Sequence, residues 1–121
     1  MNDGKTMDND PATSSSRIED RWLDLQEWNR QKGVLLAAKE DLRLTEMHWE
    51  VIDFLRGYYL RNGLARSGRE VAEALARAFA GQGGKKYLYR LFPAGPVAQG
   101  SRIAGLPEPR YTADDSFGSF F

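Results

Sequence analysis

The amino-acid sequence predicts a mostly α-helical fold in one small domain. Apolar residues recur at intervals of three and four along several stretches of the 121-residue chain, which is the spacing of one helix face. Capping residues stand before these stretches, and glycine or proline ends them. No stretch keeps the two-residue alternation of a strand, so the residues themselves predict no sheet.

The first expected helix covers residues 22–40. Trp22, Leu25 and Trp28 open an apolar face at three-residue spacing, and leucines and alanines further along extend it. Gly33 stands inside this stretch, although glycine disfavours a helix interior. We therefore predict one continuous helix that tolerates a glycine.

The clearest helical pattern covers residues 45–61. Thr45 is suited to the N-cap, and Gly63 follows the last turn. The apolar face of this helix consists of His48, Val51, Ile52, Leu55 and Tyr59. His48 is expected to be structural, because the sequence places no nucleophile beside it.

Three shorter helices are expected after this one. A capping-box sequence that starts at Ser67 opens residues 67–80. Residues 85–92 form the next segment, which a proline stops. The last helix begins with Pro96 in its first turn and ends with Gly105 as its C-cap.

Two tails are expected to flank a domain of residues 17–109. Residues 1–16 are polar and lack apolar periodicity, which predicts disorder. Residues 110–121 form a C-terminal arm. Its aromatic residues are Tyr111, Phe117, Phe120 and Phe121. These aromatics indicate either an anchor onto the body or a partner, or an ordinary frayed end, and both interpretations stay open.

The composition argues against most catalytic and metal sites. The chain has no cysteine and a single histidine, so disulfides, thiolate metal sites and persulfides are excluded. We expect no cofactor, no metal and no enzymatic activity. No apolar run approaches the roughly 18 residues that span a bilayer, and the N-terminus lacks the apolar core of a signal peptide. We expect a cytoplasmic protein without membrane insertion.

The charge is balanced overall but unevenly placed. The formal net charge is zero, yet residues 1–55 are mainly acidic and residues 56–110 mainly basic. Such asymmetry suggests an anionic partner for the basic half. The acidic segment folding back beside the basic one explains it equally well.

Two long strings carry a resemblance to a known family. The first, residues 44–56, reads LTEMHWEVIDFLR, and the second, residues 86–96, reads KYLYRLFPAGP. A third string, IAGLPEP, follows at residues 103–109. Over about residues 22–109 the chain resembles the DsrC/TusE family of sulfur-relay proteins, also called the gamma subunit of dissimilatory sulfite reductase.

This resemblance implies both a fold and a chemistry. The implied fold is a compact helical array with a small N-terminal β-hairpin, which would make the class α+β, although residues 1–20 lack strand alternation. The implied chemistry uses one or two cysteines, one inner and one on a C-terminal arm. Ser101 stands at the inner position and Thr112 near the arm position. A serine has no accessible thiolate and holds no sulfane sulfur, so relay chemistry is expected to be lost.

The leading functional expectation is a regulator or adaptor in sulfur metabolism, with sulfite reductase or sulfur-relay proteins as partners. Four cations lie around the segment that resembles the family's arm-docking site. They are Lys85, Lys86, Arg90 and Arg102. We expect them to bind a partner or another anion, unless they form only a solvated basic face.

The alternative, from another class, is a DNA-binding regulator of sulfur genes. Residues 45–61 and 67–80 have a helix-turn-helix outline. The arginines around its turn are Arg56, Arg61, Arg66 and Arg69. Acidic residues cancel the charge of the second helix, which weakens this reading. Sulfur transfer itself, on family membership alone, ranks below both.

Overall fold

The computed structural model describes Arg21 and residues 25–109. In chain order these residues form the helices α2 (Arg30–Ala38), α3 (Glu46–Asn62), α4 (Gly68–Ala78), a 3-10 turn η1 (Ala80–Gln82), α5 (Gly84–Leu91) and α6 (Pro96–Ile103). The mostly helical class is confirmed, and this described part of the chain contains no strand. The implied N-terminal β-hairpin and the two predicted tails lie outside the described residues.

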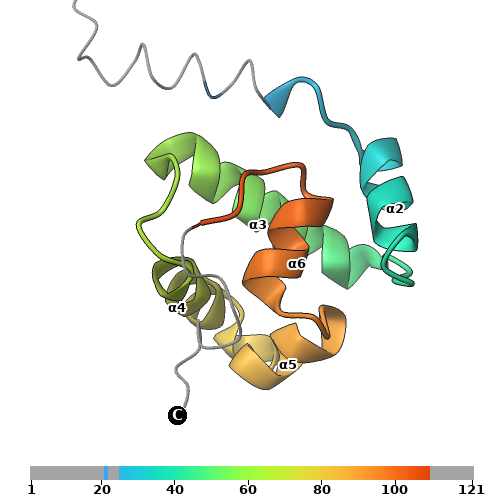
Figure 1. The fold of residues 1–121 in the computed structure, drawn as a ribbon. Coiled ribbons are helices and arrows are strands. Elements are labelled where there is room, and N and C mark those ends of the chain that lie inside the picture. Colours follow the sequence, from blue (N-terminus) through green and yellow to red (C-terminus); the bar gives the residue numbers. More distant parts are fainter. Residues whose placement is uncertain (1–20, 22–24, 110–121) are drawn as a thin grey trace, which may run out of the picture.

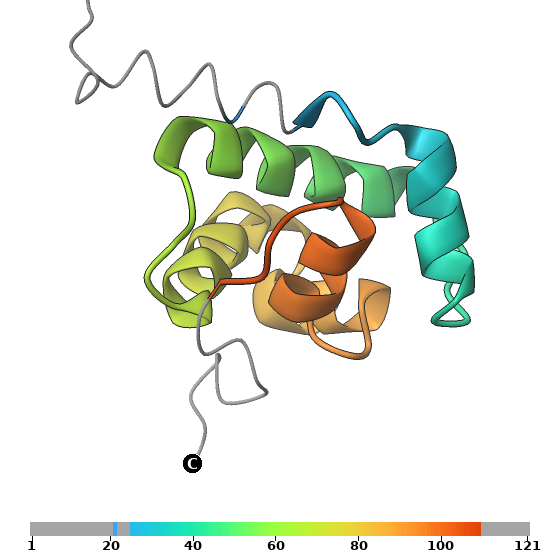
Figure 2. The same ribbon diagram turned by 45° about the horizontal axis from the view of Figure 1, so that its top comes forward.

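Helix α6 is the centre of the fold. It packs against α2, α3, α4 and α5, whereas α3 runs along one side of the molecule with α2 near one end and α4 near the other (Figures 1 and 2). Residues on several sides of α6 are buried, including the polar Gln99 and Ser101. Six of its eight residues are buried, and only Ala98 and Arg102 are open to solvent in part, so most of α6 is constrained by its neighbours.

A close contact between α3 and α6 holds the core together. Leu55 on α3 approaches the backbone of Gly100, where a Cβ atom would lie 2.8 Å from the Leu55 Cδ1 atom. Both residues are buried, as are Val51 and Ile52 on the same face of α3. The glycine therefore lets the two helices approach more closely than any larger residue permits.

The prediction of one continuous helix over residues 22–40 was wrong. The chain turns at residues 26–29, and α2 starts afresh with Asn29 as its N-cap. The Asn29 side chain accepts a hydrogen bond from the Lys32 backbone N–H at 2.9 Å. The turn brings the Trp28 indole inward, where its Nε1–H donates to the Ile103 carbonyl at 2.8 Å. This contact spans 75 residues of sequence, so local periodicity gave no sign of it.

Trp28 also explains two of the glycines. A Cβ atom at Gly33 would lie 2.8 Å from the Trp28 ring, and one at Gly105 would overlap it. Gly105 has a φ of +72°, which favours glycine as well. The indole packs edge-on against Trp49, with ring centroids 6.4 Å apart. Trp28 thus fills the space between the start of α2, the middle of the core and the end of α6.

The remaining predicted helices are confirmed to within a few residues. Thr45 and Ser67 occupy the N-cap positions of α3 and α4, and Pro96 stands in the first turn of α6. The Ser67 side chain accepts a hydrogen bond from the backbone N–H of Glu70. Over Arg21 and residues 25–109, none of the helices combines the length and apolarity needed to cross a membrane.

Candidate functional site

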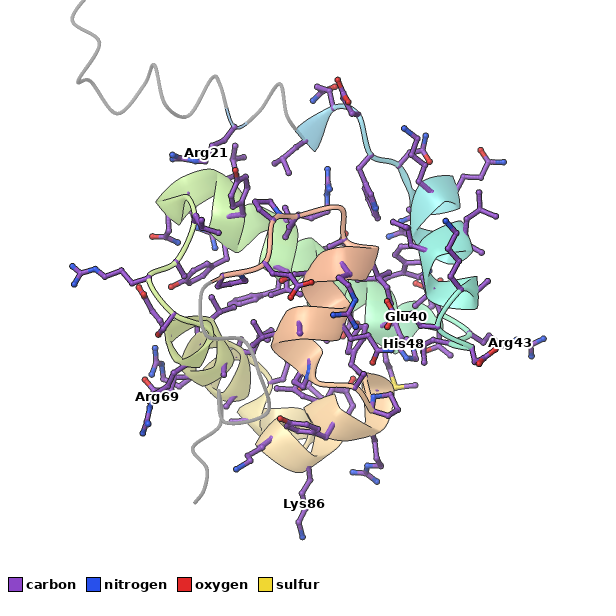
Figure 3. All side chains as sticks on the ribbon, in the orientation of Figure 1. Arg21, Glu40, Arg43, His48, Arg69 and Lys86 are labelled. Atoms are coloured by element: carbon purple, nitrogen blue, oxygen red, sulfur yellow. The ribbon has the colours of Figure 1, made fainter. Side chains whose placement is uncertain are left out.

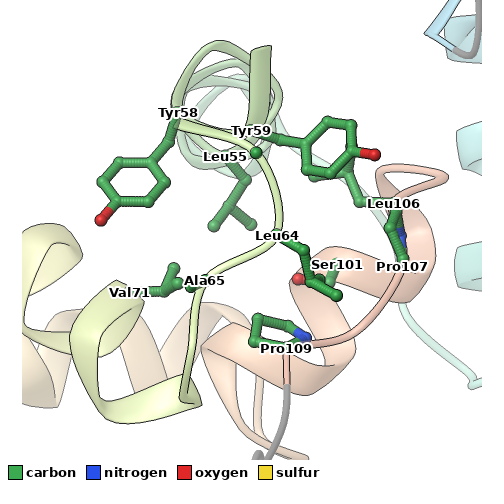
Figure 4. A pocket seen from close by; sticks show the side chains of 11 residues that line it. Leu55, Tyr58, Tyr59, Leu64, Ala65, Val71, Ser101, Leu106, Pro107 and Pro109 are labelled. Carbon is green, nitrogen blue, oxygen red and sulfur yellow. The ribbon is translucent and has the colours of Figure 1, made fainter. Parts of the chain in front are cut away.

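Ser101 lies in the protein interior beside a small cavity. Its exposed fraction is 2%, and the space next to it measures about 20 Å³, room for one water-sized sphere (Figure 4). The other residues that line this cavity are Leu55, Tyr58, Tyr59, Gly63, Leu64, Ala65, Val71, Leu106, Pro107 and Pro109. They come from the end of α3, the connection to α4, the start of α4 and the segment that follows α6.

The cavity is built without an activating group for Ser101. Its lining includes no histidine, carboxylate or cation, and no hydrogen bond of the described residues engages the Ser101 hydroxyl. The cavity lining includes two tyrosines, Tyr58 and Tyr59. Burial raises the pKa of Tyr58, and the adjacent Glu70, to which Tyr58 is hydrogen-bonded, raises it further. Among the described residues that line the cavity, none is a base that could take the proton of the Ser101 hydroxyl.

The predicted basic set does not form one group. Lys85, Lys86 and Arg90 all belong to α5, and Lys86 extends away from the body (Figure 3). Arg102 instead lies on α6, where its Nε and Nη2 donate to the two carboxylate oxygens of Glu40 at 3.0 and 2.8 Å. All three α5 cations are exposed.

The Glu40–Arg102 pair belongs to a larger polar network. Arg102 also pairs with Glu108 at 3.4 Å, and Gln99 donates to Glu40 at 3.1 Å. Hydrogen bonding to Arg102 lowers the pKa of Glu40, and the same bond raises the pKa of Arg102. Gln99 is 3% exposed and also accepts from the Ala94 backbone N–H. The network ties the segment after α2 to α6 and to the chain that leaves it.

Arg56, the first of the predicted DNA-contacting arginines, is a structural residue in the fold. Its two terminal nitrogens donate to the carbonyl oxygens of Ala104 and Leu25, at 2.6 and 2.8 Å. Its guanidinium also lies 4.1 Å from the centre of the Trp28 ring. Burial lowers the pKa of Arg56, and the charge of Asp53 opposes this shift. A phosphate would have to compete with these contacts.

The other three arginines divide as well. Arg69 pairs with Glu73 one turn along α4, at 3.3 Å. Arg61 and Arg66 are exposed at the end of α3 and in the connection to α4. Of the four predicted DNA contacts, Arg56 is held within the fold, Arg69 forms an exposed pair with Glu73, and Arg61 and Arg66 are exposed.

The expected structural role of His48 is confirmed. The side chain is 6% exposed, and both ring nitrogens contact protein atoms. Sequence reasoning missed Glu40 and Gln99, because their partners lie far away along the chain; Glu40 and Arg102 are 62 residues apart. Within the described ranges, no three side chains of the kinds that hold metal ions come together.

Comparisons with known proteins identify the family of the chain. Residues 13–112 match the family described as DsrC like protein. Sulfurtransferase TusE of Sodalis glossinidius is 41% identical over 86 residues, which cover 70% of this chain and 80% of that protein. Sulfurtransferase TusE of Escherichia coli K12 is 40% identical over 84 residues, covering 69% and 77%.

Solved structures of DsrC proteins are also similar to this chain. The NMR structure of Allochromatium vinosum DsrC aligns with a TM-score of 0.59 at 41% identity, over 68% of this chain and 74% of that one. The crystal structure of the oxidized gamma-subunit of the dissimilatory sulfite reductase from Archaeoglobus fulgidus also gives 0.59, at 33% identity over 74% and 83%. The chain therefore belongs to the DsrC-like family, as a member whose 121 residues include no cysteine.

Proposed function

We propose that this protein is a thiol-free regulator or adaptor of a sulfur relay, which binds a family partner without carrying sulfur. One observation carries the proposal. Ser101, at the position where the family resemblance places an inner cysteine, is buried in the central helix of a family fold. The scaffold is kept while the sulfur-bearing atom is replaced by a hydroxyl that forms no persulfide.

The relatives support the choice of partner. One similar structure is a subunit of dissimilatory sulfite reductase by its description, and the similar TusE proteins are sulfurtransferases by theirs. A chain with the same scaffold and no thiol is suited to occupy a docking site on such a protein. Bound there, it would exclude a thiol-bearing relative and lower the flow of sulfur.

We assign the docking surface to α5 and its cations. Lys85, Lys86 and Arg90 are exposed on a helix that carries no acidic residue. The positive end of the α5 dipole adds to the charge of the two lysines, which lie in its first turn. Arg102 is left out of this surface, because Glu40 and Glu108 already hold its guanidinium. An acidic site on the partner is the complementary surface.

Calorimetry with the full chain tests the proposal. The titrants are sulfite reductase and the relay sulfurtransferases of the source organism, each alone and then in competition with a thiol-bearing family member. We expect saturable binding that the competitor displaces. Absence of any affinity at roughly tens of micromolar for every one of these proteins would leave the family assignment intact and refute the adaptor.

A charge-reversal pair locates the surface. Lys86→Glu combined with Arg90→Glu is expected to slow association about tenfold and to change dissociation little, because rim charges mainly steer encounter. Arg61→Glu combined with Arg66→Glu is the matched control, since both are exposed cations but lie at the end of α3 and in the connection to α4. Equal effects of the two changes would point to the net charge of the protein rather than to α5.

A further inference from the structure

An open hollow lies between the turn before α2 and the middle of α3, where residues 25–29 run alongside α3 (Figures 1 and 2). Its volume is about 460 Å³, within the size range of pockets that hold small molecules. It shares no lining residue with the cavity beside Ser101. The polar side chains of its wall are Gln26, Asn29, Arg30 and Arg56, and the apolar ones are Leu25, Trp28 and Leu60. Gly57 completes the described lining, which contains two guanidinium groups and no carboxylate.

Arg56 brings a half-buried positive charge to this hollow, and no carboxylate of the described residues lies within ion-pair distance of it. Asp53, one turn earlier on α3, pairs instead with Arg30 at 3.6 Å. Burial lowers the pKa of Arg56, which is the effect expected when the lost hydration of a cation is not fully replaced. Charges withdrawn from water are ordinarily paired, because an isolated one is costly. An anion in the hollow would supply the missing partner.

Arg56 can bind such an anion without giving up its structural bonds. A guanidinium has five N–H groups, and the carbonyls of Ala104 and Leu25 take one from each terminal nitrogen. Among the described residues, nothing accepts from the other three. A DNA duplex is too wide to enter the hollow, so its phosphates would have to draw Arg56 out of these bonds. A small anion inside the hollow needs no such step.

Three further arginines surround the hollow. Arg30 is part of its wall. Arg61 lies over Gly57, since a Cβ atom at this glycine would be 3.2 Å from the Arg61 Nη1 atom. Arg21 donates from its Nε atom to the carbonyl of Leu60 at 2.9 Å. Guanidinium groups from three separate parts of the chain thus meet at one place.

The excess of positive charge remains after the acids are counted. Two acids of the described residues lie close in the chain to these four arginines, namely Glu27 and Asp53. Glu27 is exposed and does not line the hollow. The pair of Asp53 with Arg30 is open to solvent, since both side chains are more than half exposed. Four cations therefore stand against two acids, and neither acid lines the hollow.

We infer that this hollow binds a small organic anion, which carries a phosphate or carboxylate group on an apolar body. Guanidinium groups hold such oxygens through paired N–H bonds. The Asn29 amide adds a neutral donor, because its oxygen is already taken by the Lys32 backbone N–H. The ring of Trp28 and its apolar neighbours would contact the body of the ligand. The inference does not rest on the proposed function, because no lining residue belongs to α5.

Titration of the isotope-labelled full chain with small anions, followed by NMR, tests the inference. The probes are phenyl phosphate, benzoate and inorganic phosphate, and benzyl alcohol is the uncharged match. We expect the two aromatic anions to shift the side-chain signals of Arg56 and Trp28 in a saturable way, and benzyl alcohol to cause no saturable shift. Phenyl phosphate should bind at least about tenfold more tightly than inorganic phosphate, because only it reaches the apolar wall. The tighter of the two aromatic anions identifies the charged group of the ligand.

A pair of isosteric variants makes the result specific. Arg56 supports the fold, so the test changes Gln26 instead, whose side chain is exposed. Gln26→Glu places a carboxylate in the wall of the hollow and is expected to weaken phenyl phosphate binding about tenfold or more, because like charges repel. Gln82→Glu makes the same change in η1, far from the hollow, and should leave the affinity within about twofold. Circular dichroism verifies that both variants keep their helical content.

Several results would overturn the inference. They are the absence of saturable shifts at up to about 10 mM phenyl phosphate, shifts spread equally over the α5 cations, and equal effects of Gln26→Glu and Gln82→Glu. Equal affinities for phenyl phosphate and inorganic phosphate would contradict a ligand with an apolar body. Glu19, Asp20 and Asp24 lie outside the described residues, so a variant with all three changed to their amides is titrated as well. Binding by that variant, without binding by the parent protein, would assign the hollow to the chain's own carboxylates.

Discussion

The Nε2 atom of His48 donates a hydrogen bond to the Leu91 carbonyl oxygen at 2.7 Å, which joins the first turn of α3 to the end of α5. On the other side of the ring, Nδ1 lies 3.0 Å from the Thr45 backbone N–H and accepts from it. An imidazole that accepts at Nδ1 and donates at Nε2 is neutral. The ring also packs edge-on against Phe92, at 5.1 Å between centroids.

This arrangement predicts a dependence of stability on pH. Burial lowers the pKa of His48, and the bond to Leu91 opposes this only in part. The unfolded chain, with a pKa of about 6.5, then binds the proton more readily than the folded one. The stabilising contribution is therefore complete above pH 6.5 and declines as the pH falls toward the folded-state pKa. Urea unfolding at several pH values from about 7.5 to about 5 measures how the free energy of unfolding changes over this range.

The His48→Gln variant serves as the reference for that measurement. A glutamine can donate to Leu91 but does not titrate, so the loss of stability over this window should be smaller in the variant. At neutral pH the variant is expected to be less stable by about 1–2 kcal/mol, because the shape of the ring and its edge-on contact with Phe92 are lost and glutamine does not keep the hydrogen bonds to Leu91 and to the Thr45 backbone N–H together. Identical pH profiles of the two proteins would show that another group controls the acid response.

Gly105→Ala is predicted to destabilise the protein strongly. The new methyl group would overlap the Trp28 ring, and the φ of +72° disfavours alanine. We expect a loss of about 2–4 kcal/mol, seen as a lower denaturation midpoint. Gly81→Ala is the control, because a Cβ atom there meets no atom within 4 Å. The control should be neutral or slightly more stable, since alanine reduces the freedom of the unfolded chain.

Arg102→Ala is predicted to act on stability rather than on partner binding. Both side chains of the Glu40–Arg102 pair are partly open to solvent, at 26% and 40%, so the loss should be only about 0.5–1 kcal/mol. Arg102 lowers the pKa of Glu40, so this contribution is present above the unfolded-state value of about 4.3 and disappears as pH falls through the folded one. The free energies of unfolding of the variant and of the parent protein should thus become equal at acidic pH. Lys86→Ala is the comparison and should leave the denaturation curve unchanged.

The chemistry of Ser101 gives a further prediction. Polysulfide should leave the intact mass of the natural chain unchanged, because no thiol is present. Ser101→Cys is expected to gain a single sulfur atom, since the adjacent space of about 20 Å³ admits little more. Loading should be slow at neutral pH, because apolar surroundings raise the pKa of a thiol. A sulfur adduct on the natural chain, found by mass spectrometry, would contradict the thiol-free proposal.

The sequence alone determined the helices after residue 45 and the family. Thr45 and Ser67 are caps whose effect is confined to one helical turn, so local spacing was enough to place the starts of α3 and α4. The long strings around Trp49 and Phe92 indicated the family for the same reason, since they are continuous in the chain. The absence of cysteine needed no structure at all.

Only the tertiary structure decided what the charged and aromatic side chains near these helices do. The first predicted helix is interrupted near Trp28, whose indole bonds to the carbonyl of Ile103. Because Ile103 is 75 residues away in the chain, local periodicity could not reveal this contact. From the sequence, Arg56 was a candidate DNA-contacting residue. In the structure it donates a hydrogen bond to the carbonyl of Ala104, which is 48 residues further along the chain. The hydrogen bonds of long, flexible side chains depend on distance in space. Helical periodicity contains no information about which distant carbonyl or carboxylate the fold brings within that distance.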